Sequence, residues 1–311
     1  MRLPIVVGTR GSPLAIAQTR HVCARLVAAH PALAEDGALC TETITTSGDR
    51  FTDRPLADIG GKGLFTKEIE EALLDGRIDL AVHSMKDVPT WLPEGLEIAA
   101  MPEREDPRDV LIARDGPNPA GLADLPQGAR VGTGSLRRQA QILARRPDID
   151  IVPMRGNVGT RLRKVADGAA DATLLALAGL KRLGEKIDGM TVLEPAEMLP
   201  AVGQGALGIE CRTGDERMQE MLQPIVDPVT TAAVRCERAL LEVLDGSCRM
   251  PIAGLAVADD SGWLRLDALT ARPDGSVCHR AERAGGMADA AAIGRDAGAA
   301  LREAGGPDWF E

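Results

Sequence analysis

The sequence predicts a chain of two α/β lobes followed by a smaller α+β domain with a three-stranded antiparallel sheet. Short apolar runs alternate with helical segments twice, before and after a proline-rich stretch. Two similar strand-to-helix turns, at residues 8–12 and 132–135, recur in the two halves. The last 85 residues instead contain three strand-like runs separated by turn signals. Ligands bind outside the carboxyl ends of strands in such folds, so a cleft between the lobes is the predicted binding place.

The first lobe begins with a strand and a capped helix. Ser12 followed by Pro13 is typical of a helix start, and Gly76 of a helix end. Four prolines between residues 89 and 107 then indicate a boundary. We expect the elements of this lobe at 5–7 (strand), 13–29 (helix), 65–74 (helix) and 78–82 (strand).

The second lobe repeats this alternation, and the C-terminal domain follows it. Ser135 is the expected cap of a helix that comes directly after a strand. In the second lobe we expect strands at 129–132, 149–154 and 172–176, and helices at 135–146 and 160–166. In the C-terminal domain we expect helices at 230–244 and 287–304, and strands at 252–258, 263–271 and 276–281.

The composition is typical of a soluble globular protein. Apolar residues make up 44% of the chain and charged residues 26%. The N-terminus enters a strand-like run without the long apolar stretch of a secretory signal, so we predict a cytoplasmic protein that spans no membrane. The six cysteines form no C-x-x-C pair and no zinc-finger spacing, which indicates reduced thiols and no structural metal.

Charge is distributed unevenly along the chain. The formal net charge is −10, which disfavours nucleic acid as the main partner. Residues 130–182 nevertheless hold eleven basic residues, nine of them arginine, and only four acidic ones. Arginine pairs bidentately with carboxylate or phosphate, so this concentration predicts a focused anion site. For Arg145 and Arg146 the better interpretation is a solvated helix face.

Cationic and hydroxyl side chains gather at the predicted strand ends. Helix starts at Ser12, Ser135 and Thr160 offer free backbone N–H groups and a positive dipole end, which suit a ligand with many negative groups. Ordinary helix capping is a sufficient explanation for Ser12 and for Ser135. It does not explain why arginines lie next to several of these turns. The segment 132–134 lacks the third glycine of a dinucleotide fingerprint because Arg137 stands there, which disfavours nucleotide binding.

Asp87 is the one carboxylate within this set of cations. It is either the partner of a neighbouring arginine or an ionised group that stabilises a cationic intermediate. Cys248 lies in a Gly-Ser loop beside Arg249. It is either an inert, small apolar side chain or a nucleophile that tethers a group. The residues alone leave both alternatives open.

Eight motifs, in order along the whole chain, resemble those of the porphobilinogen deaminase (hydroxymethylbilane synthase) family. They are GGKGLF (60–65), HSMKDVPT (83–90), EREDPRD (103–109), SLRRQAQ (135–141), RGNVGTRL (155–162), AGLKRLG (178–184), LPAVGQGALGIECR (199–212) and GSC-x-x-PI (246–252). The resemblance implies two periplasmic-binding-protein-like α/β lobes and a third, cofactor-carrying α+β domain. The expected boundaries are 1–102 with 203–222 for the first lobe, 108–199 for the second, and 228–311 for the third domain.

The resemblance also implies an activity and its residues. The family joins four porphobilinogen molecules head to tail on a covalent dipyrromethane primer, releases ammonia each time, and then hydrolyses off hydroxymethylbilane. Asp87 is implied as the catalytic residue, and Cys248 as the thioether attachment of dipyrromethane. The other implied cofactor contacts are Lys86, Asp87, Thr133, Ser135, Arg137, Arg138 and Gly156. The implied substrate contacts are Arg10, Ser12, Arg155, Arg161 and Arg182, and Lys62 and Phe65 are implied to belong to a mobile lid.

Two positions depart from the family pattern. Gly134 replaces the usual serine, and Asp58 stands where some relatives have lysine. The implied protein is a monomeric transferase of tetrapyrrole and heme biosynthesis, with a small-molecule substrate, no nucleic-acid or membrane partner and no metal.

Two other function classes remain as alternatives. A non-catalytic carboxylate-binding protein on the same bilobal scaffold would use the arginines, but it has no need of Cys248 or Asp87. A ligand-sensing regulator would need a DNA-binding domain, and no helix-turn-helix-like segment precedes the first strand.

Overall fold

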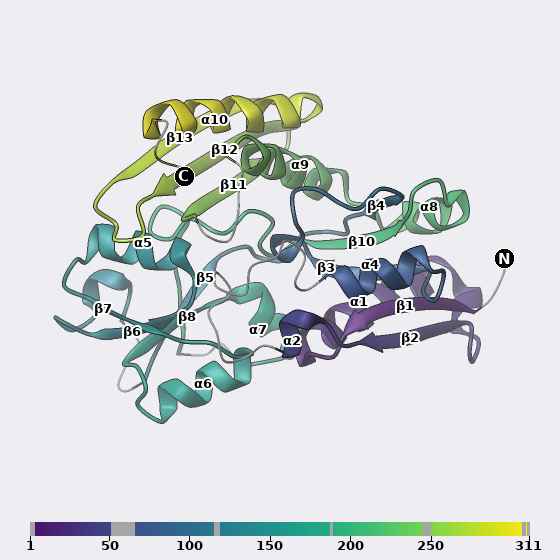
Figure 1. The fold of residues 1–311 in the computed structure, drawn as a ribbon, viewed down its shortest axis with the longest axis horizontal. Coiled ribbons are helices and arrows are strands. Elements are labelled where there is room, and N and C mark those ends of the chain that lie inside the picture. The colour runs from purple at the N-terminus through teal and green to yellow at the C-terminus, as the bar shows by residue number, and fades with distance from the viewer. Residues whose placement is uncertain are drawn as a thin grey trace. The chain divides into compact units, whose positions relative to one another are not determined.

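The computed structural model describes residues 4–50, 66–114, 119–186, 189–244, 250–306 and 309, except the side chains of 49 and 50 (Figure 1). These residues group into two compact units. The first unit comprises the described residues up to Glu105 together with Ala206–Thr231. The second comprises Asp106–Gly205 and the described residues from Ala232 onward.

The first unit is built on a five-stranded sheet in the order β2-β1-β3-β10-β4. Strand β1 is parallel to β2 and β3, whereas β10 is antiparallel to β3 and β4. The chain therefore returns to this sheet with β10 after the second lobe. The strands are β1 (Ile5–Arg10), β2 (Leu39–Ile44), β3 (Leu80–Ser84), β4 (Leu96–Ala100) and β10 (Leu207–Arg212). The helical segments are α1 (Pro13–Ala29), η1 (Pro31–Ala34), α2 (Ser47–Arg50), α4 (Lys67–Leu74), η2 (Met85–Asp87), α8 (Glu216–Leu222) and η4 (Gln223–Ile225).

Alternation along the strands of this sheet divides its side chains between two apolar clusters. Val82 and Ile209 belong to the cluster that includes Leu26 of α1. Ala81 belongs to the cluster that includes Ile69 of α4. Successive side chains of a strand point to opposite faces, so helices cover both faces and the strand ends carry the polar residues.

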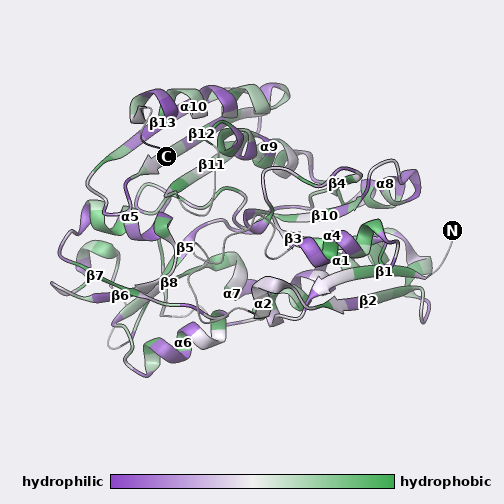
Figure 2. Cartoon of the chain, in the orientation of Figure 1, coloured by the Kyte–Doolittle hydropathy of each residue, from purple (hydrophilic) through white to green (hydrophobic). Residues whose placement is uncertain are grey.

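The second unit begins with a sheet of the same design, in the order β7-β6-β8-β5-β9. Strand β6 is parallel to β7 and β8, whereas β5 is antiparallel to β8 and β9. In Figure 2, α5 carries hydrophilic and hydrophobic residues along its length. The strands are β5 (Asp109–Ala113), β6 (Arg130–Thr133), β7 (Asp150–Pro153), β8 (Ala172–Ala176) and β9 (Thr191–Val192). The helical segments are η3 (Leu122–Asp124), α5 (Leu136–Arg145), α6 (Val158–Ala166) and α7 (Leu177–Leu183).

The C-terminal part is a three-stranded antiparallel sheet with two long helices (Figure 1). Leu240 of α9 and Ile293 of α10 pack with Leu264 and Leu266 of the sheet in one apolar cluster. The strands are β11 (Ile252–Ala258), β12 (Trp263–Ala271) and β13 (Cys278–Gly286). The helical segments are α9 (Pro228–Val243), η5 (Met287–Asp289) and α10 (Ala290–Gly305).

The fold class is confirmed: two α/β lobes and a smaller C-terminal antiparallel sheet. The third predicted strand is present, but its predicted bounds 276–281 are wrong, because β13 pairs with β12 over nine residues, from Cys278 to Gly286. The last helix begins at Ala290 because the three residues before it form η5. The division at 1–102 with 203–222, 108–199 and 228–311 stays a proposal. No helix among the described residues combines the length and the apolar character needed to cross a bilayer.

Candidate functional site

In the first unit, the turns that follow β1 and β3 lie at the same edge of the sheet, because these strands are parallel neighbours. Arg10 ends β1, and Ser12 caps α1 by accepting a hydrogen bond from Ala15 N at 3.2 Å. Strand β3 ends at Ser84 and leads into η2. A small pocket of about 50 Å³ lies here, and it is lined by Arg10, Ser12, Leu14, Ala15, Gln18, Val82, His83, Ser84 and Asp87.

This pocket brings together three of the predicted residues with three polar residues that were not predicted. Arg10, Ser12 and the exposed Asp87 all line it, and exposed Lys86 directly precedes Asp87. Gln18, His83 and Ser84 were missed as site residues. Gln18 Nε2 donates to Ser84 Oγ at 3.1 Å. The only sequence signal for this contact was a glutamine within an Ala/Leu-rich helix.

His83 forms a buried pair with Glu210 of β10. His83 Nε2 lies 2.9 Å from Glu210 Oε2, and the two side chains are 5% and 1% exposed. The other oxygen of Glu210, Oε1, is buried and has no hydrogen-bond partner in the described part of the chain. Glu70 of α4 interacts electrostatically with both residues, and burial raises the pKa of its carboxyl.

In the second unit, the turns after β6 and β7 are adjacent, because Thr133 pairs with Pro153. Thr133 Oγ1 accepts a hydrogen bond from Ser135 N at 3.1 Å, and Ser135 caps α5. The cap of α6 is Asn157, whose Oδ1 accepts from Thr160 N at 2.9 Å. The expected helix start at Thr160 is therefore wrong: α6 begins at Val158, because the Asn157 side chain caps it by binding the N–H of Thr160.

Arg155 and Arg161 lie beside these two turns. Arg155 Nη1 is buried and has no hydrogen-bond partner among the described residues. Arg161 Nε donates to Gly156 O at 2.8 Å, and Gly156 has φ = +123°, a conformation that favours glycine. At Gly134, a Cβ atom would lie 3.2 Å from Met154 O, so a serine there would crowd this carbonyl oxygen.

Arg137 and Arg138 converge on a carboxylate that sequence reasoning missed. Asp109 is fully buried, and its two oxygens accept from Arg137 Nη2 and Arg138 Nη2, each at 2.8 Å. Gln204 Nε2 donates to the same group at 2.9 Å. Arg137 Nη1 also donates to Leu199 O at 2.7 Å. The only signal for Asp109 was its place at the end of the EREDPRD motif.

Three other arginines of the basic segment, Arg182, Arg145 and Arg146, bind backbone carbonyl groups. Arg182 Nη2 donates to Gly205 O at 2.7 Å. Arg145 Nη2 donates to Ala196 O at 2.6 Å, and Arg146 donates to four carbonyl oxygens within residues 122–126. Arg145 is exposed, as predicted for a solvated face, and Arg146 is half-buried. Their guanidinium groups also bind the loop before β6 and the segment around residue 196, which the sequence did not indicate.

Several predictions fall outside the residues that the structure describes. These are the cofactor attachment at Cys248, the lid residues Lys62 and Phe65, and the departure at Asp58. Among the described residues, no group of three or more His, Cys, Asp or Glu side chains is arranged to hold a metal ion.

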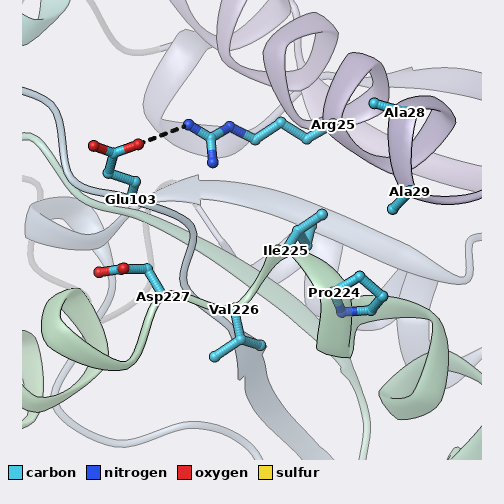
Figure 3. Close-up of a pocket in the computed structure, with 8 residues that line it drawn as sticks. All are labelled: Arg25, Ala28, Ala29, Glu103, Pro224, Ile225, Val226 and Asp227. Carbon is cyan, nitrogen blue, oxygen red and sulfur yellow. Dashed lines mark hydrogen bonds and ion pairs between the residues drawn. The ribbon is translucent and has the colours of Figure 1, made fainter.

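A larger pocket of about 370 Å³ lies elsewhere in the first unit (Figure 3). Arg25 Nη2 and Glu103 Oε2 form an ion pair across it at 3.4 Å, and Asp227 adds a second carboxylate. It contains none of the predicted site residues. Its remaining lining is Ala28, Ala29, Pro224, Ile225 and Val226, so it does not resemble a site for a polyanion.

Comparisons with known proteins agree over nearly the whole chain. A family model described as porphobilinogen deaminase, dipyromethane cofactor binding domain, matches residues 5–220, and one for the porphobilinogen deaminase C-terminal domain matches 231–303. A porphobilinogen deaminase from Syntrophobacter fumaroxidans is 52% identical over 301 residues, which are 97% of this chain and 95% of that protein. One from Nitrobacter winogradskyi is 53% identical and covers 98% of this chain and 94% of its own. A chloroplastic porphobilinogen deaminase from Oryza sativa subsp. japonica is 52% identical, and the match covers 99% of this chain and 86% of that protein.

Solved structures add only a distant likeness. A periplasmic binding protein from Salmonella typhimurium, described as having high arginine specificity, is 13% identical and covers 74% of this chain and 94% of its own, with a TM-score of 0.39. A structural similarity this distant does not indicate what this chain binds.

Proposed function

Since the chain belongs to the porphobilinogen deaminase family, we propose that it joins four porphobilinogen molecules head to tail and then releases hydroxymethylbilane by hydrolysis. Each joining step releases one ammonia, so the enzyme is a transferase that forms a carbon–carbon bond. We place this activity in the cytoplasm, in a monomer, with no nucleic-acid or membrane partner.

The observation that supports this proposal best is Nη1 of Arg155, which is buried and has no hydrogen-bond partner in the part of the chain that the structure describes. A buried donor without a partner costs about 1–3 kcal/mol, and more when it is charged, so such a group favours a ligand that completes its hydrogen bonds. Porphobilinogen carries an acetate and a propionate side chain, and arginine binds carboxylates with two parallel hydrogen bonds. The proposed substrate contacts are Arg10, Ser12, Arg155, Arg161 and Arg182.

Asp87 is proposed to stabilise positive charge during deamination. Loss of ammonia from the aminomethyl group leaves a cationic methylene-pyrrole, and an exposed carboxylate at a strand end is suited to such a cation. Ser12, Gln18 and Ser84 line the same pocket and supply neutral hydrogen-bonding groups around it.

The described residues fit a cofactor that carries carboxylate groups. The turns after β6 and β7 combine two helix N-termini with Arg155 Nη1, and Arg138 Nε is a second buried donor without a partner in the described chain. Arg137 and Arg138 each have five N–H donors. Asp109 takes one from each, and the carbonyl oxygens of Leu199 and Leu174 each take one more. Dipyrromethane supplies a permanent primer when bound. The proposed contacts are Cys248, Lys86, Asp87, Thr133, Ser135, Arg137, Arg138 and Gly156.

Incubation of the purified protein with porphobilinogen tests this function. We expect ammonia and hydroxymethylbilane in a ratio of four to one, the latter measured as porphyrin after oxidation. A carboxylate-binding protein would instead bind porphobilinogen without releasing ammonia. That outcome would replace the proposed function with the alternative.

A further inference from the structure

We propose that Lys164 of α6 is a positioning residue, which fixes the turn at residues 154–157 so that Arg155 meets a carboxylate of the substrate. This inference rests on the proposed function, which places Arg155 in the binding set and gives Lys164 no role. It is drawn from the hydrogen bonds of the turn between β7 and α6 in the second unit.

The Arg155 side chain depends on its own backbone for its location. Its guanidinium has no hydrogen-bond or ion-pair partner among the residues that the structure describes, and its Nη1 is buried. Arg137, in contrast, is held by the carboxylate of Asp109. Arg155 lacks such a tether, so the conformation of the turn from which it projects sets the direction of its side chain.

Steric contacts alone do not fix that turn. Gly156 has φ = +123°, and glycine adopts a wide range of backbone angles without a steric penalty. Gly134, in the adjacent turn after β6, offers no side chain, although a Cβ atom there would lie 3.8 Å from Arg155 Cγ. The departure from the serine of the family pattern therefore removes a contact with the Arg155 side chain, and hydrogen bonds must select the conformation of the turn.

Two cationic side chains of α6 supply those hydrogen bonds. Lys164 Nζ donates to Arg155 O at 3.1 Å, and Arg161 Nε donates to Gly156 O at 2.8 Å. Positions 161 and 164 are three residues apart, so their side chains lie on the same face of the helix. Two successive carbonyl groups of the turn are thus bound by one face of α6.

The bound carbonyl groups also direct the N–H groups of the turn. In a trans peptide the C=O and N–H bonds point in opposite directions, so the N–H groups of Gly156 and Asn157 point away from Lys164 and Arg161. Neither N–H has a partner in the described part of the chain. The turn therefore offers two N–H groups together with the Arg155 guanidinium, a combination that suits a carboxylate.

The first test uses the purified holoenzyme without substrate. Lys164→Met removes the donor and keeps an unbranched side chain. The Gly156 amide signal, assigned in nitrogen-15 spectra, is expected to move in Lys164→Met and to stay in place in Arg163→Met. Arg163 is the matched control, because it is an exposed cation of the same helix. An unmoved Gly156 signal in Lys164→Met would overturn the proposal, whether or not the protein turns over porphobilinogen.

Kinetics supply the second test. Lys164→Met should raise the KM for porphobilinogen about three- to tenfold, the ratio that corresponds to one ordinary hydrogen bond, and should leave kcat close to that of the wild type. Lys164→Arg restores a donor and should recover most of the lost affinity. The unfolding midpoint of each variant should stay close to that of the wild type, because Lys164 is exposed.

A purely electrostatic role for Lys164 would give different results. Attraction of an anionic substrate would raise KM equally in Lys164→Met and Arg163→Met, and the effect would fade at high ionic strength. Positioning instead predicts a rise of KM that is confined to Lys164→Met and persists in salt. Equal effects in the two variants, or no recovery in Lys164→Arg, would overturn the proposal.

Failure of this inference is distinguishable from failure of the proposed function. A wild-type protein that releases no ammonia from porphobilinogen contradicts the proposed function, and the Gly156 signal still decides whether Lys164 fixes the turn. An active wild type whose KM is unchanged by Lys164→Met contradicts only the role of Lys164.

Discussion

Asp109 Oδ2 accepts a hydrogen bond from Arg137 Nη2 at 2.8 Å, and the Asp109 carboxylate is fully buried in the second unit. Burial by itself would raise the pKa of Asp109. The positive charges and hydrogen bonds of Arg137 and Arg138 outweigh that effect and hold the pKa well below its usual range. Asp109 thus supplies the counter-charge of two buried arginines and orients them inside the protein.

Asp109→Asn should destabilise the protein, because two buried guanidinium groups lose their counter-charge. Breaking a buried pair in this way costs about 3–5 kcal/mol, measured as the free energy of unfolding in urea at pH 7. A depressed pKa in the folded state means that the stabilisation is present at neutral pH and is lost as pH falls below about 3.9, the ordinary value for aspartate. The difference between wild type and variant should therefore narrow in acid.

The matched control is Asp148→Asn, which removes the carboxylate partner of Arg146 at an exposed position. Exposed pairs contribute little, so its unfolding free energy should change far less. Equal losses in the two variants would contradict the role assigned to the buried Asp109 network.

Glu70→Gln, in contrast to Asp109→Asn, should increase the stability of the protein at neutral pH. Burial raises the pKa of Glu70 in the folded protein, so ionisation of this carboxyl is penalised at neutral pH. The variant should be more stable than the wild type at pH 7, and this advantage should disappear as pH falls toward about 4.3, the value of an unfolded glutamate. Thermal unfolding midpoints at the two pH values measure it. Glu71→Gln, exposed on the same helix, should show no such gain.

Local patterns predicted most of the fold. Strands β8, β11 and β12 have the predicted bounds, and α1 begins after the predicted cap Ser12. These elements depend on runs of apolar residues and on capping groups that lie within a few positions of one another. The errors occur where longer-range pairing or a competing side chain decides, as in the length of β13 and in the cap of α6 by Asn157.

The candidate site was predictable only in part, for the same reason. Residues at strand ends, such as Arg10 and Asp87, follow from the order of strands and turns. The partners that define their chemistry are distant in sequence. Asp109 is 28 residues from Arg137, and His83 is 127 residues from Glu210. No periodicity in a single sequence reports which buried carboxylate meets which cation.

Arg161→Leu should weaken substrate binding, because a charge-assisted hydrogen bond to a carboxylate contributes roughly 1.5–3 kcal/mol. The KM for porphobilinogen should rise roughly tenfold to a hundredfold. Arg163→Leu is the control on the same helix, since Arg163 is exposed. Arg145→Leu is unsuitable as a control, because it would remove the hydrogen bond that Arg145 donates to Ala196 O. Equal KM values for Arg161→Leu and Arg163→Leu would remove Arg161 from the binding set.

Asp87→Asn should reduce turnover roughly a hundredfold to a thousandfold, because the amide keeps the shape of the carboxylate but loses the charge that stabilises the substrate cation. Asp87 is exposed, so the unfolding midpoint should stay close to that of the wild type. Asp75→Asn, at the exposed end of α4, is the control for a general effect of charge. Wild-type turnover in Asp87→Asn would exclude this role.

Cys248 should carry dipyrromethane through a thioether. Only a thiolate adds readily to a methylene-pyrrole cation, and a free cysteine with a pKa of about 8.5 is mostly protonated at neutral pH, so Arg249 is expected to favour the thiolate. A thioether resists the hydrolysis that releases the product, which lets one primer serve every cycle. Intact-mass spectrometry of the native protein should show one added two-pyrrole group, located on the peptide that contains Cys248.

The control for this attachment is internal to the chain. Burial raises the pKa values of the Cys211 and Cys236 thiols to about 12, which keeps them protonated and unreactive at neutral pH. Cys278 is exposed, so accessibility alone would mark it as the competing site. Cys248→Ser should lose the added mass entirely, whereas Cys278→Ser should retain it. An active enzyme whose Cys248 peptide has its unmodified mass would rule out the thioether, because turnover would then proceed without a primer at this residue.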